Sequence, residues 1–349
     1  MPSGALFPAE THLAAEFSVC RATISKVLKS LGDEGLLFSQ QGKGRTVMHR
    51  GTARAPTIAV LLDNLEALSH PVMAARMKGI SDAVAESDFH LSLFAKNPNL
   101  GTDELLKGLF DFLKEAQGVI IGTHAFEERI VFELASRYPT VWLEHPSDRS
   151  KIHGVFSDYL GAGFLGARHL LENGHSRIAV VGLDDSISIS RQHAAGASLA
   201  LQMLADTEDR VEISRWIVGQ EFGGFTAEAG YETVLRNWSS GASRPTGLLF
   251  ASDDLAIGGY QALSSLGLKV PEDVSLVGCN GDRRVIGDGR RLTTVALDFE
   301  ASGRACVNII KEIIEKGRIQ EIDSTSQPAR LVKGNSVGSP ALTTHLVTV

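Results

Sequence analysis

From Ile58 onward, short apolar runs of strand length alternate with longer stretches in which apolar residues recur at helical spacing. Such alternation favours parallel β-sheets covered by helices. About 280 residues of this pattern are enough for two α/β lobes, each with its own core. Helices such as 71–87 and 159–173 are predicted between the strands. The predicted strands are 58–62, 90–95, 118–122, 140–144, 154–157, 178–182, 215–219, 247–251 and 274–278.

The first 50 residues have a different pattern. Residues 11–17 carry apolar side chains at helical spacing, and Ser18 can cap a second helix whose apolar stripe runs through residues 24–31. Residues 36–47 are typical of two strands joined at a glycine-rich tip, 41–44. Two helices followed by a two-stranded wing predict a winged helix-turn-helix.

Composition limits the possible classes of protein. Hydrophobic residues make up 43% of the chain and charged residues 21%, which is ordinary for a globular protein. No apolar run of about 18 residues is present, so neither a membrane-spanning helix nor a membrane partner is expected. Cys20, Cys279 and Cys306 are scattered without metal-ligand spacing. We therefore expect a cytoplasmic protein without a disulfide, a metal site or a cofactor.

The net charge of −7 is unevenly distributed. Residues 1–50 contain six Lys or Arg against four Asp or Glu, so this segment carries +2 and the remainder −9. A mildly basic head on an acidic body is expected if only the head binds phosphate groups. The sequence divides into a DNA-binding head (1–50), a linker (51–56), a ligand-sensing domain (57–335) and a C-terminal tail (336–349).

The head resembles the winged-helix module of the gluconate-repressor (GntR) family. The matching segments are 7–10, 19–24, 35–37 and 42–47, and together they cover essentially all of residues 4–48. Members of that family begin with a further helix that packs under the recognition helix, and no such helix precedes residue 4 here. We therefore expect either residues upstream of Met1 or exposed apolar faces around Leu13 and Leu28.

The resemblance implies that the second helix and the wing contact DNA. Arg21 and Thr23 would contact bases and phosphates, because Arg suits bidentate reading of guanine and a hydroxyl at a helix start suits phosphate. Gly42 would let the wing backbone approach the minor groove, and Lys43 would add charge. The family more often has Arg near Ser25, so a different sequence preference is expected. The implied DNA-binding residues are Arg21, Thr23, Ser25, Lys26, Gly42 and Lys43.

Residues 57–335 resemble the sensor domain of lactose and galactose repressors, which has the two-lobed fold of type I periplasmic sugar-binding proteins. The resemblance rests on the ordered motifs 154–158, 169–178, 251–258, 267–278 and 292–295. It implies two lobes with parallel sheets and a small-molecule effector, a carbohydrate by default. The arabinose-repressor type joins this sensor to a GntR-type head, which is the arrangement predicted here.

Candidate effector residues follow from this resemblance and from the strand ends. Ligands of open α/β sheets bind at the carboxyl ends of the strands, so residues there would face one cleft. Asp158 could accept hydrogen bonds from sugar hydroxyls, and Phe222 or Phe225 could stack on a pyranose ring. The candidate set is His70, Met73, Thr123, His124, Asp158, Arg191, His193, Phe222, Ser252, Asp253 and Asn280.

Two departures from the family pattern affect the expected ligand. The family places Arg three residues before Gly196, where this chain has His193, and Arg191 is a candidate substitute. The family's Gly-Phe-Asp near the cleft reads Gly278-Cys279-Asn280 here, which exchanges a carboxylate for an amide that both donates and accepts.

Two other functions compete with the regulator. Gly161, Gly163 and Gly166 match a dinucleotide-binding G-x-G-x-x-G, with Asp184 as the ribose-binding acid, which would suit an NAD-dependent dehydrogenase. In that fingerprint the first Gly follows its strand at once, whereas these glycines would lie inside a helix. The second alternative is a ligand-binding protein whose head no longer binds DNA.

The favoured interpretation is a transcription regulator rather than an enzyme. We expect a repressor that acts as a homodimer, with two heads on two half-sites of operator DNA. Effector binding would close the lobes and change the spacing of the heads.

Overall fold

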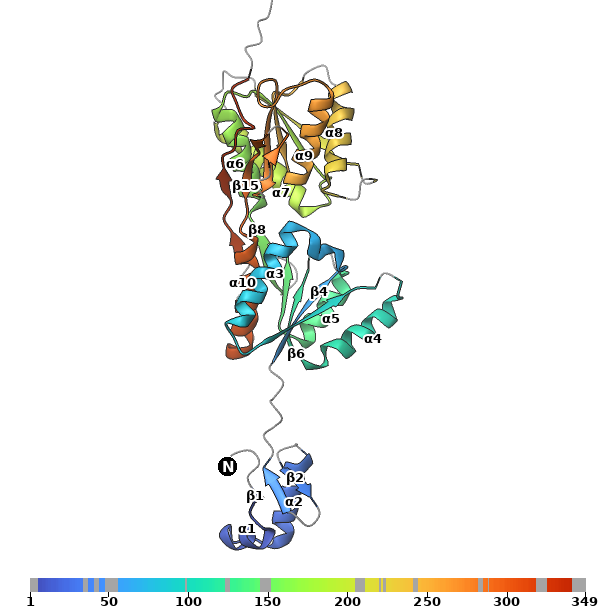
Figure 1. Ribbon diagram of the computed structural model, residues 1–349, viewed down its shortest axis with the longest axis vertical. Coiled ribbons are helices and arrows are strands. Elements are labelled where there is room, and N and C mark those ends of the chain that lie inside the picture. The colour runs from blue at the N-terminus through green and yellow to red at the C-terminus, as the bar shows by residue number, and fades with distance from the viewer. Residues whose placement is uncertain are drawn as a thin grey trace, which may run out of the picture.

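The computed structural model describes residues 6–33, 37–40, 44–47, 56–97, 99–122, 126–144, 152–204, 211–219, 221, 224–240, 244–281, 285–287, 289–317 and 325–340. These residues form a small head and two α/β lobes (Figure 1). The predicted class, a helix-turn-helix followed by two lobes with parallel sheets, is confirmed.

The head contains two helices and a three-stranded antiparallel sheet. Its elements are β1 (Leu6–Phe7), α1 (Glu10–Glu16), α2 (Arg21–Asp33), β2 (Leu37–Gln40) and β3 (Gly44–Val47), with strand order β1-β3-β2. The strand β1 was not predicted, and it adds a third strand to the wing. Ser18 was predicted to cap α2 but lies in the turn before it, with a φ of 53°, because α2 begins only at Arg21.

A four-residue core holds the head together. Leu13, Ile24, Leu28 and Leu37 are each at most 8% exposed and pack against one another. The two helices and the wing cover Leu13 and Leu28 themselves. Among the described residues of the head, the large apolar side chains that stay exposed are Phe17, Val19 and Val27. Phe17 lies one helical turn after Leu13, and Val27 lies next to Leu28, so the expected exposed apolar faces are confirmed in part.

The first lobe is built on a six-stranded parallel sheet in the order β16-β8-β7-β6-β4-β5. Alternate residues of β4 face opposite cores: Ile58, Val60 and Leu62 pack with α3 and α10, whereas Ala59 and Leu61 pack with α4 and α5. This alternation is the period of two that a strand imposes. The strands are β4 (Thr57–Leu62), β5 (His90–Ala95), β6 (Ala116–Ile121), β7 (Thr140–Leu143), β8 (His153–Ser157) and β16 (Thr325–Gln327). The helices are η1 (Glu66–Ser69), α3 (Pro71–Ala85), α4 (Thr102–Phe112), η2 (Leu113–Glu115), α5 (Glu128–Arg137) and α10 (Phe299–Lys316).

The second lobe repeats this plan in the order β10-β9-β11-β12-β15-β17, in which only the edge strand β17 is antiparallel to its neighbour. The helices α6 and α7 pack on one face of the sheet and α8 and α9 on the other. The strands are β9 (Arg177–Gly182), β10 (Glu212–Ile217), β11 (Gly247–Phe250), β12 (Ser275–Asn280), β15 (Thr293–Ala296) and β17 (Arg330–Val332), with a short hairpin of β13 (Val285–Ile286) and β14 (Arg290–Arg291). The helices are α6 (Tyr159–Glu172), α7 (Ser188–Leu204), α8 (Ala227–Ser240) and α9 (Asp253–Ser265).

The second lobe extends past the predicted boundary at residue 335. Ser336 is fully buried, and its hydroxyl donates to the Leu276 carbonyl oxygen and accepts from the Thr293 amide. Residues 336–340 therefore belong to this lobe and not to a separate tail.

Three crossovers join the lobes at the carboxyl edges of the sheets. The chain passes from β8 to α6 around Asp158, from β15 to α10 around Asp298, and from β16 to β17 at residues 328–329. Two lobes joined in this way open and close by rotation about these segments.

Three helix pairs cross with their backbones in close contact. A Cβ atom on Gly163 of α6 would lie 1.8 Å from the carbonyl oxygen of His193 on α7, and one on Gly196 would lie 1.9 Å from that of Leu160. Neither position has room for a side chain. The same arrangement recurs where α3 crosses α10 and where α8 crosses α9, at the glycine pairs Gly79 and Gly303, and Gly230 and Gly258.

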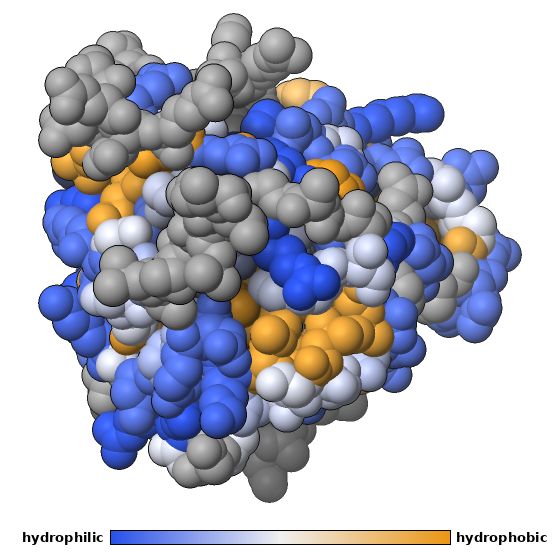
Figure 2. Space-filling view, turned by 90° about the horizontal axis from the view of Figure 1, so that it is seen from above, coloured by the Kyte–Doolittle hydropathy of each residue, from blue (hydrophilic) through white to orange (hydrophobic). Residues whose placement is uncertain are grey.

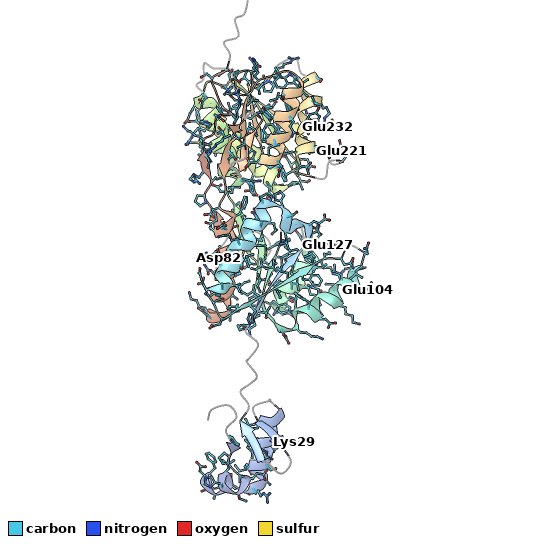
Figure 3. The ribbon with its side chains drawn as sticks, in the orientation of Figure 1. Lys29, Asp82, Glu104, Glu127, Glu221 and Glu232 are labelled. Atoms are coloured by element: carbon cyan, nitrogen blue, oxygen red, sulfur yellow. The ribbon has the colours of Figure 1, made fainter. Side chains whose placement is uncertain are left out.

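Charged side chains are exposed on both lobes and on the head. The acidic side chains Glu104, Glu127, Glu221 and Glu232 are exposed on the lobes, and Lys29 is exposed on α2 of the head (Figure 3). From the end of the second lobe, hydrophobic residues gather in patches between hydrophilic ones (Figure 2). Among the described helices, none combines the length and the apolar character needed to cross a bilayer.

We predict that Gly163→Ala lowers the free energy of unfolding by about 2 kcal/mol or more, because the added methyl group forces α6 away from α7. The matched control is Gly108→Ala on α4, where a Cβ meets no atom within 4 Å. That substitution is expected to raise stability by roughly 0.5–1 kcal/mol through helix propensity. Urea unfolding measures both, and equal effects would contradict the role given to the crossing.

Candidate functional site

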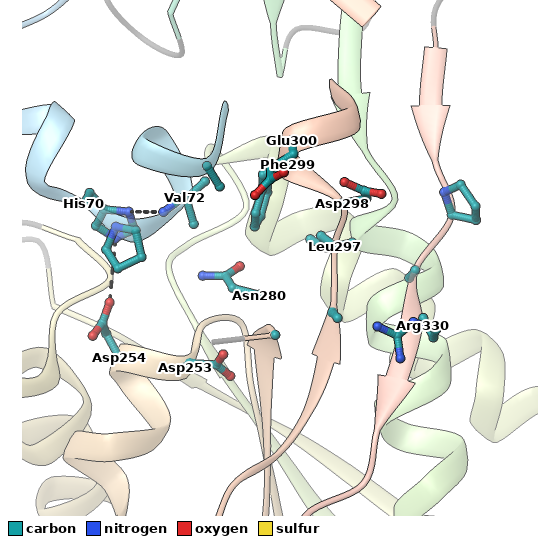
Figure 4. A pocket seen from close by; sticks show the side chains of 16 residues that line it. His70, Val72, Asp253, Asp254, Asn280, Leu297, Asp298, Phe299, Glu300 and Arg330 are labelled. Atoms are coloured by element: carbon teal, nitrogen blue, oxygen red, sulfur yellow. Dashed lines mark hydrogen bonds and ion pairs between the residues drawn. The ribbon is translucent and has the colours of Figure 1, made fainter. Parts of the chain in front are cut away.

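Two cavities lie between the lobes, on either side of the first turn of α3. The larger, here called the hinge cavity, has a volume of about 620 Å³ and lies beside the crossovers (Figure 4). Its lining is His70, Pro71, Val72, Ala75, Asp253, Asp254, Asn280, Gly281, Ala296, Leu297, Asp298, Phe299, Glu300, Pro328, Ala329 and Arg330. Four of these residues are acidic.

The second cavity, here called the apolar cavity, has a volume of about 470 Å³. The first lobe contributes η1 and the start of α3, and the second lobe contributes the loops after β9, β10 and β11. Its lining is Ala67, His70, Val72, Met73, Arg76, Tyr159, Leu183, Ile187, Ile189, Gly224, Phe225, Thr226, Ala251, Ser252 and Asn280. A mostly apolar hollow with a few polar groups is the usual form of a small-molecule site.

His70 connects the two lobes and lines both cavities. It precedes α3, and its Nδ1 accepts a hydrogen bond from the Val72 amide at 3.3 Å, which caps the helix. Its Nε2 lies 3.6 Å from Oδ2 of Asp254 on α9 of the second lobe (Figure 4). This pair is an ionic contact only when the imidazole is protonated.

A buried ion pair lies behind the first-lobe side of the apolar cavity, and one of its members, Arg76, lines that cavity. Arg76 on α3 pairs with Glu144, which follows β7, and their side chains are 4% and 3% exposed. Glu144 also accepts from the hydroxyl of Ser157 at 2.8 Å and from its amide at 3.1 Å. The Arg76 guanidinium lies 4.9 Å from the ring centre of Phe299. Arg76 therefore contacts the first residue of α10 and the last residue of β8, at two of the crossovers.

Tyr159 lies at the crossover next to this pair. Burial raises the pKa of its phenol to about 12, although the nearby Arg76 acts in the opposite direction. The hydroxyl therefore stays protonated at neutral pH and can donate a hydrogen bond beside the cavity.

Five of the predicted effector residues lie around these cavities. His70 and Asn280 line both cavities, Met73 and Ser252 line the apolar cavity, and Asp253 lines the hinge cavity. Ser252 caps α9 by accepting from the Leu255 amide at 3.2 Å, and Asp253 accepts from the Thr294 hydroxyl at 2.6 Å.

Three other predicted residues lie outside the lining of both cavities. Asp158 caps α6 by accepting from the Gly161 amide at 2.7 Å. Arg191 is exposed on α7 and donates to the backbone carbonyl of Asp185. His193 is fully buried, and neither of its ring nitrogens has a hydrogen-bond partner among the described residues. Thr123, His124 and Phe222 lie outside the described residues, so their roles stay predictions.

On the head, the predicted DNA-binding residues of α2 are exposed. Arg21, Thr23, Ser25 and Lys26 all lie in the first two turns of the helix. The Arg21 guanidinium is 3.0 Å from Glu10, which also binds Arg45 of the wing at 2.8 Å. These two cations, Arg45 more than Arg21, lower the pKa of the Glu10 carboxyl. Gly42 and Lys43 lie outside the described residues.

The sequence reasoning missed Arg76, Glu144 and Tyr159. The available signal was a positive charge at position 76 in a helix whose neighbours at helical spacing, Gly79 and Ile80, are buried. A charge on the apolar face of a helix needs a buried partner. The partner is 68 residues away in sequence, so spacing alone could not identify it.

We predict that Glu144→Ala destabilises the protein by about 3–5 kcal/mol, because it leaves the buried charge of Arg76 without its carboxylate. The control is Glu133→Ala, which removes the exposed partner of Arg137 on α5 and should cost less than about 1 kcal/mol. Thermal and urea unfolding measure the difference. If Glu144→Ala lowered the free energy of unfolding no more than Glu133→Ala, the buried charge of Arg76 would not need its carboxylate partner.

A second prediction concerns His193. Its burial, and to a smaller degree Arg215, lowers its pKa from 6.5 to about 4. The unfolded chain therefore takes up a proton near pH 6.5 that the folded chain resists until about pH 4. Stability is complete above pH 6.5 and falls as the pH is lowered through that window, by up to about 3 kcal/mol.

His193→Leu should remove this part of the pH dependence. Burial also lowers the pKa values of His169 and His175, so the measured quantity is the difference between wild type and variant. Urea unfolding between pH 8 and 4.5 should give a flatter curve for the variant, and parallel curves would contradict the assignment.

Profiles of known families match both parts of the chain. Residues 1–47 match bacterial regulatory proteins of the gntR family, and residues 167–337 match a periplasmic binding protein-like domain.

Two curated relatives are regulators. An uncharacterized HTH-type transcriptional regulator in the aml 5' region of Streptomyces limosus is 28% identical over 279 residues, which cover 77% of this chain and 76% of that protein. The HTH-type transcriptional repressor PurR of Klebsiella pneumoniae is 31% identical over 184 residues, 52% of this chain. The match covers 51% of that repressor, so the chain spans about half its length.

Solved structures share the fold. A LacI family transcriptional regulator from Enterococcus faecium, with bound ribose, has a TM-score of 0.65 and 24% identity over 81% of this chain and 99% of its own. The lac repressor dimer bound to operator and an anti-inducer has a TM-score of 0.65 and 20% identity over 82% of this chain and 96% of its own.

The dehydrogenase alternative has no support from these relatives, which are regulators. Its glycine motif lies within α6, where Gly163 makes room for α7 and Gly166 approaches Leu249 of the sheet. The predicted combination is thus confirmed, and the chain is a transcriptional regulator in which a helix-turn-helix head of the gntR family is joined to a LacI-like, periplasmic-binding-protein-like ligand-binding domain.

Proposed function

We propose that this regulator is a repressor that binds operator DNA as a homodimer and responds to a small molecule held between its lobes. The observation that carries the proposal is the apolar cavity, which is lined from both lobes and from a crossover residue, Tyr159. A molecule bound there contacts both lobes at once. It therefore favours one angle between them over another, which is the requirement for a ligand to shift a conformational equilibrium.

The DNA-binding part of the proposal rests on the exposed start of α2. Arg21 is 71% exposed at its side chain, and Lys26 is exposed one turn further on. The ion pair with Glu10 holds the Arg21 guanidinium near the helix start without burying it. Arg presented in this way can read guanine or bind a phosphate once it exchanges Glu10 for DNA.

The link between the apolar cavity and the DNA-binding head is proposed to pass through the crossovers between the lobes. Arg76 contacts Ser157 and Phe299 at two crossovers and also lines the apolar cavity. Closure around a ligand would therefore move the first lobe relative to the second through groups that the ligand itself contacts. A coupling free energy of about 1–3 kcal/mol between ligand and DNA is typical of such devices.

The dimer and a small-molecule effector belong to the same proposal. The lac repressor named above is a dimer on its operator, and two heads on two half-sites would give this chain the same symmetry. A carbohydrate is the effector that the family resemblance predicts, and the Enterococcus faecium regulator holds ribose, but the mostly apolar lining of this cavity does not favour a sugar. Release of DNA on effector binding is the expected response.

We predict that Arg21→Ala weakens binding to a fragment of the chain's own upstream regulatory region by about tenfold or more. The slope of log affinity against log salt should also fall by roughly one if Arg21 contacts a phosphate. Fluorescence anisotropy at several salt concentrations measures both quantities.

The matched control is Lys114→Ala, which removes one exposed positive charge from the first lobe, where Lys114 pairs with Asp111. It should leave the affinity for DNA unchanged. Equal losses for the two variants would mean that the head does not carry the DNA contact. No binding by the wild type at low salt would favour a ligand-binding protein with a non-functional head.

A further inference from the structure

We propose that the apolar cavity selects a neutral, ring-bearing ligand with few hydrogen-bonding groups, of the aromatic or heteroaromatic class, in preference to a free sugar. This inference rests on the proposed function, which places the effector in this cavity, and it adds the chemical class of that effector.

The walls of the cavity are mostly apolar. The second lobe presents Leu183, Ile187, Ile189 and the ring of Phe225, and the first lobe presents the thioether of Met73. Leu183 and Phe225 also pack against the hydrophobic core of the second lobe, which limits their freedom to turn away. Apolar walls reward a ligand for the apolar surface that it removes from water. A ring can lie against Phe225 in an offset or edge-to-face arrangement.

The cavity has few polar groups, and several of them already make hydrogen bonds within the protein. The Ser252 hydroxyl accepts from the Leu255 amide at 3.2 Å, and the Thr226 hydroxyl accepts from the Ala229 amide at 3.1 Å. Each of these hydroxyls keeps its proton for donation, Asn280 adds an amide, and Tyr159 adds a phenol that can donate. The other two polar residues of the described lining, His70 and Arg76, already contact Asp254 and Glu144. Such a set can satisfy a ring nitrogen or a carbonyl and one or two further groups.

A free monosaccharide carries several hydroxyls, and each of them is hydrogen-bonded in water. Every hydroxyl that is buried here without a partner would cost about 1–3 kcal/mol. The described lining contains no Asp or Glu to accept from sugar hydroxyls. The four carboxylates near the crossovers line the hinge cavity instead.

The described lining offers a ligand no uncompensated positive charge. Arg76 is the strongly basic residue among the described lining residues, and its charge is already neutralised by Glu144. His193, at the position where the LacI-type sensor commonly has Arg, does not line the cavity. A carboxylate or phosphate on the ligand would therefore meet no uncompensated cation among these groups, and burying it would be unfavourable. The described lining therefore offers a sugar acid or a sugar phosphate no uncompensated positive charge.

The size of the cavity agrees with such a ligand. Its volume of about 470 Å³ lies in the range of sites for small organic molecules, roughly 300–1,000 Å³.

Calorimetry on the full chain tests the proposal with two sets of probes: indole and quinoline against ribose, arabinose, glucose and gluconate. At least one aromatic probe should bind saturably and more tightly than every sugar. Phe225→Ala should weaken that probe by about tenfold or more through loss of the ring contact. Ala67→Trp, in the half-buried η1 turn of the other lobe, should fill the cavity and abolish binding. Phe132→Ala, at an exposed position on α5, is the matched control and should change nothing.

The proposal is overturned if a sugar binds more tightly than both aromatic probes, or if neither aromatic probe binds. It is also overturned if Ala67→Trp and Phe225→Ala bind the aromatic probe as the wild type does. Thermal unfolding of each variant checks that it is folded. DNA binding, measured separately with each probe, tests the proposed function. If a sugar bound and altered the affinity for DNA, the aromatic class of ligand would be wrong, but the proposed function as a regulator would stand. If the wild type bound no DNA at low salt, the proposed function itself would fail.

Discussion

The buried contact between Arg76 and Glu144 is the interaction on which the arrangement of the lobes depends. Burying two charges costs several kcal/mol per ion unless they meet each other and further hydrogen-bonding groups. Here the pair also contacts Ser157, and the guanidinium lies over Phe299. Because Ser157 ends β8 and Phe299 begins α10, the requirement to keep this charge satisfied fixes where two crossovers leave the first lobe. Glu144 meets the requirement with a φ of 55°, a conformation that residues other than glycine rarely adopt.

Much of the fold follows from local pattern. Runs such as 58–62 and 90–95 could be identified as strands because each is short and apolar and because helical spacing follows it. The second lobe was harder to predict at its end. Thr293–Ala296 was recognised only as a motif, and β16 and β17 are three residues each, too short for a reliable periodic signal. Both of these short strands take their conformation from partners far away in sequence, Val155–Ser157 in one lobe and Thr294–Ala296 in the other.

In the candidate site too, some residues could be found from local pattern and others could not. His70, Met73, Ser252 and Asn280 follow strands or begin helices at the carboxyl edge of a sheet, and this rule brought them to the cavities. His193 was placed by analogy with a family position and lies instead in the core of the second lobe, where α7 crosses α6 at Gly163. The contact at this crossing is made by the backbone carbonyl of His193, and its side chain is buried beside it. Analogy with a family position did not show whether this side chain faces the cleft or the core. Arg76 was missed because its buried partner Glu144 is 68 residues away and follows β7.

The position of the linker places a physical condition on any response to a ligand. The head is joined to the lobes through residues that precede Thr57, the first residue of β4, whereas both cavities lie at the carboxyl ends of the strands. A six-residue strand separates these ends by about 20 Å, so a ligand in either cavity lies far from Thr57, where the strand begins. The β4 strand is buried on both faces and cannot slide by itself.

The first lobe must then move as a rigid unit, and in a monomer such a rotation would carry the head along without changing how it meets DNA. Only when two copies present two heads to one duplex does a change in the angle between the lobes alter the spacing of those heads. The distance between the cavities and the start of β4 therefore supports the dimer proposed above.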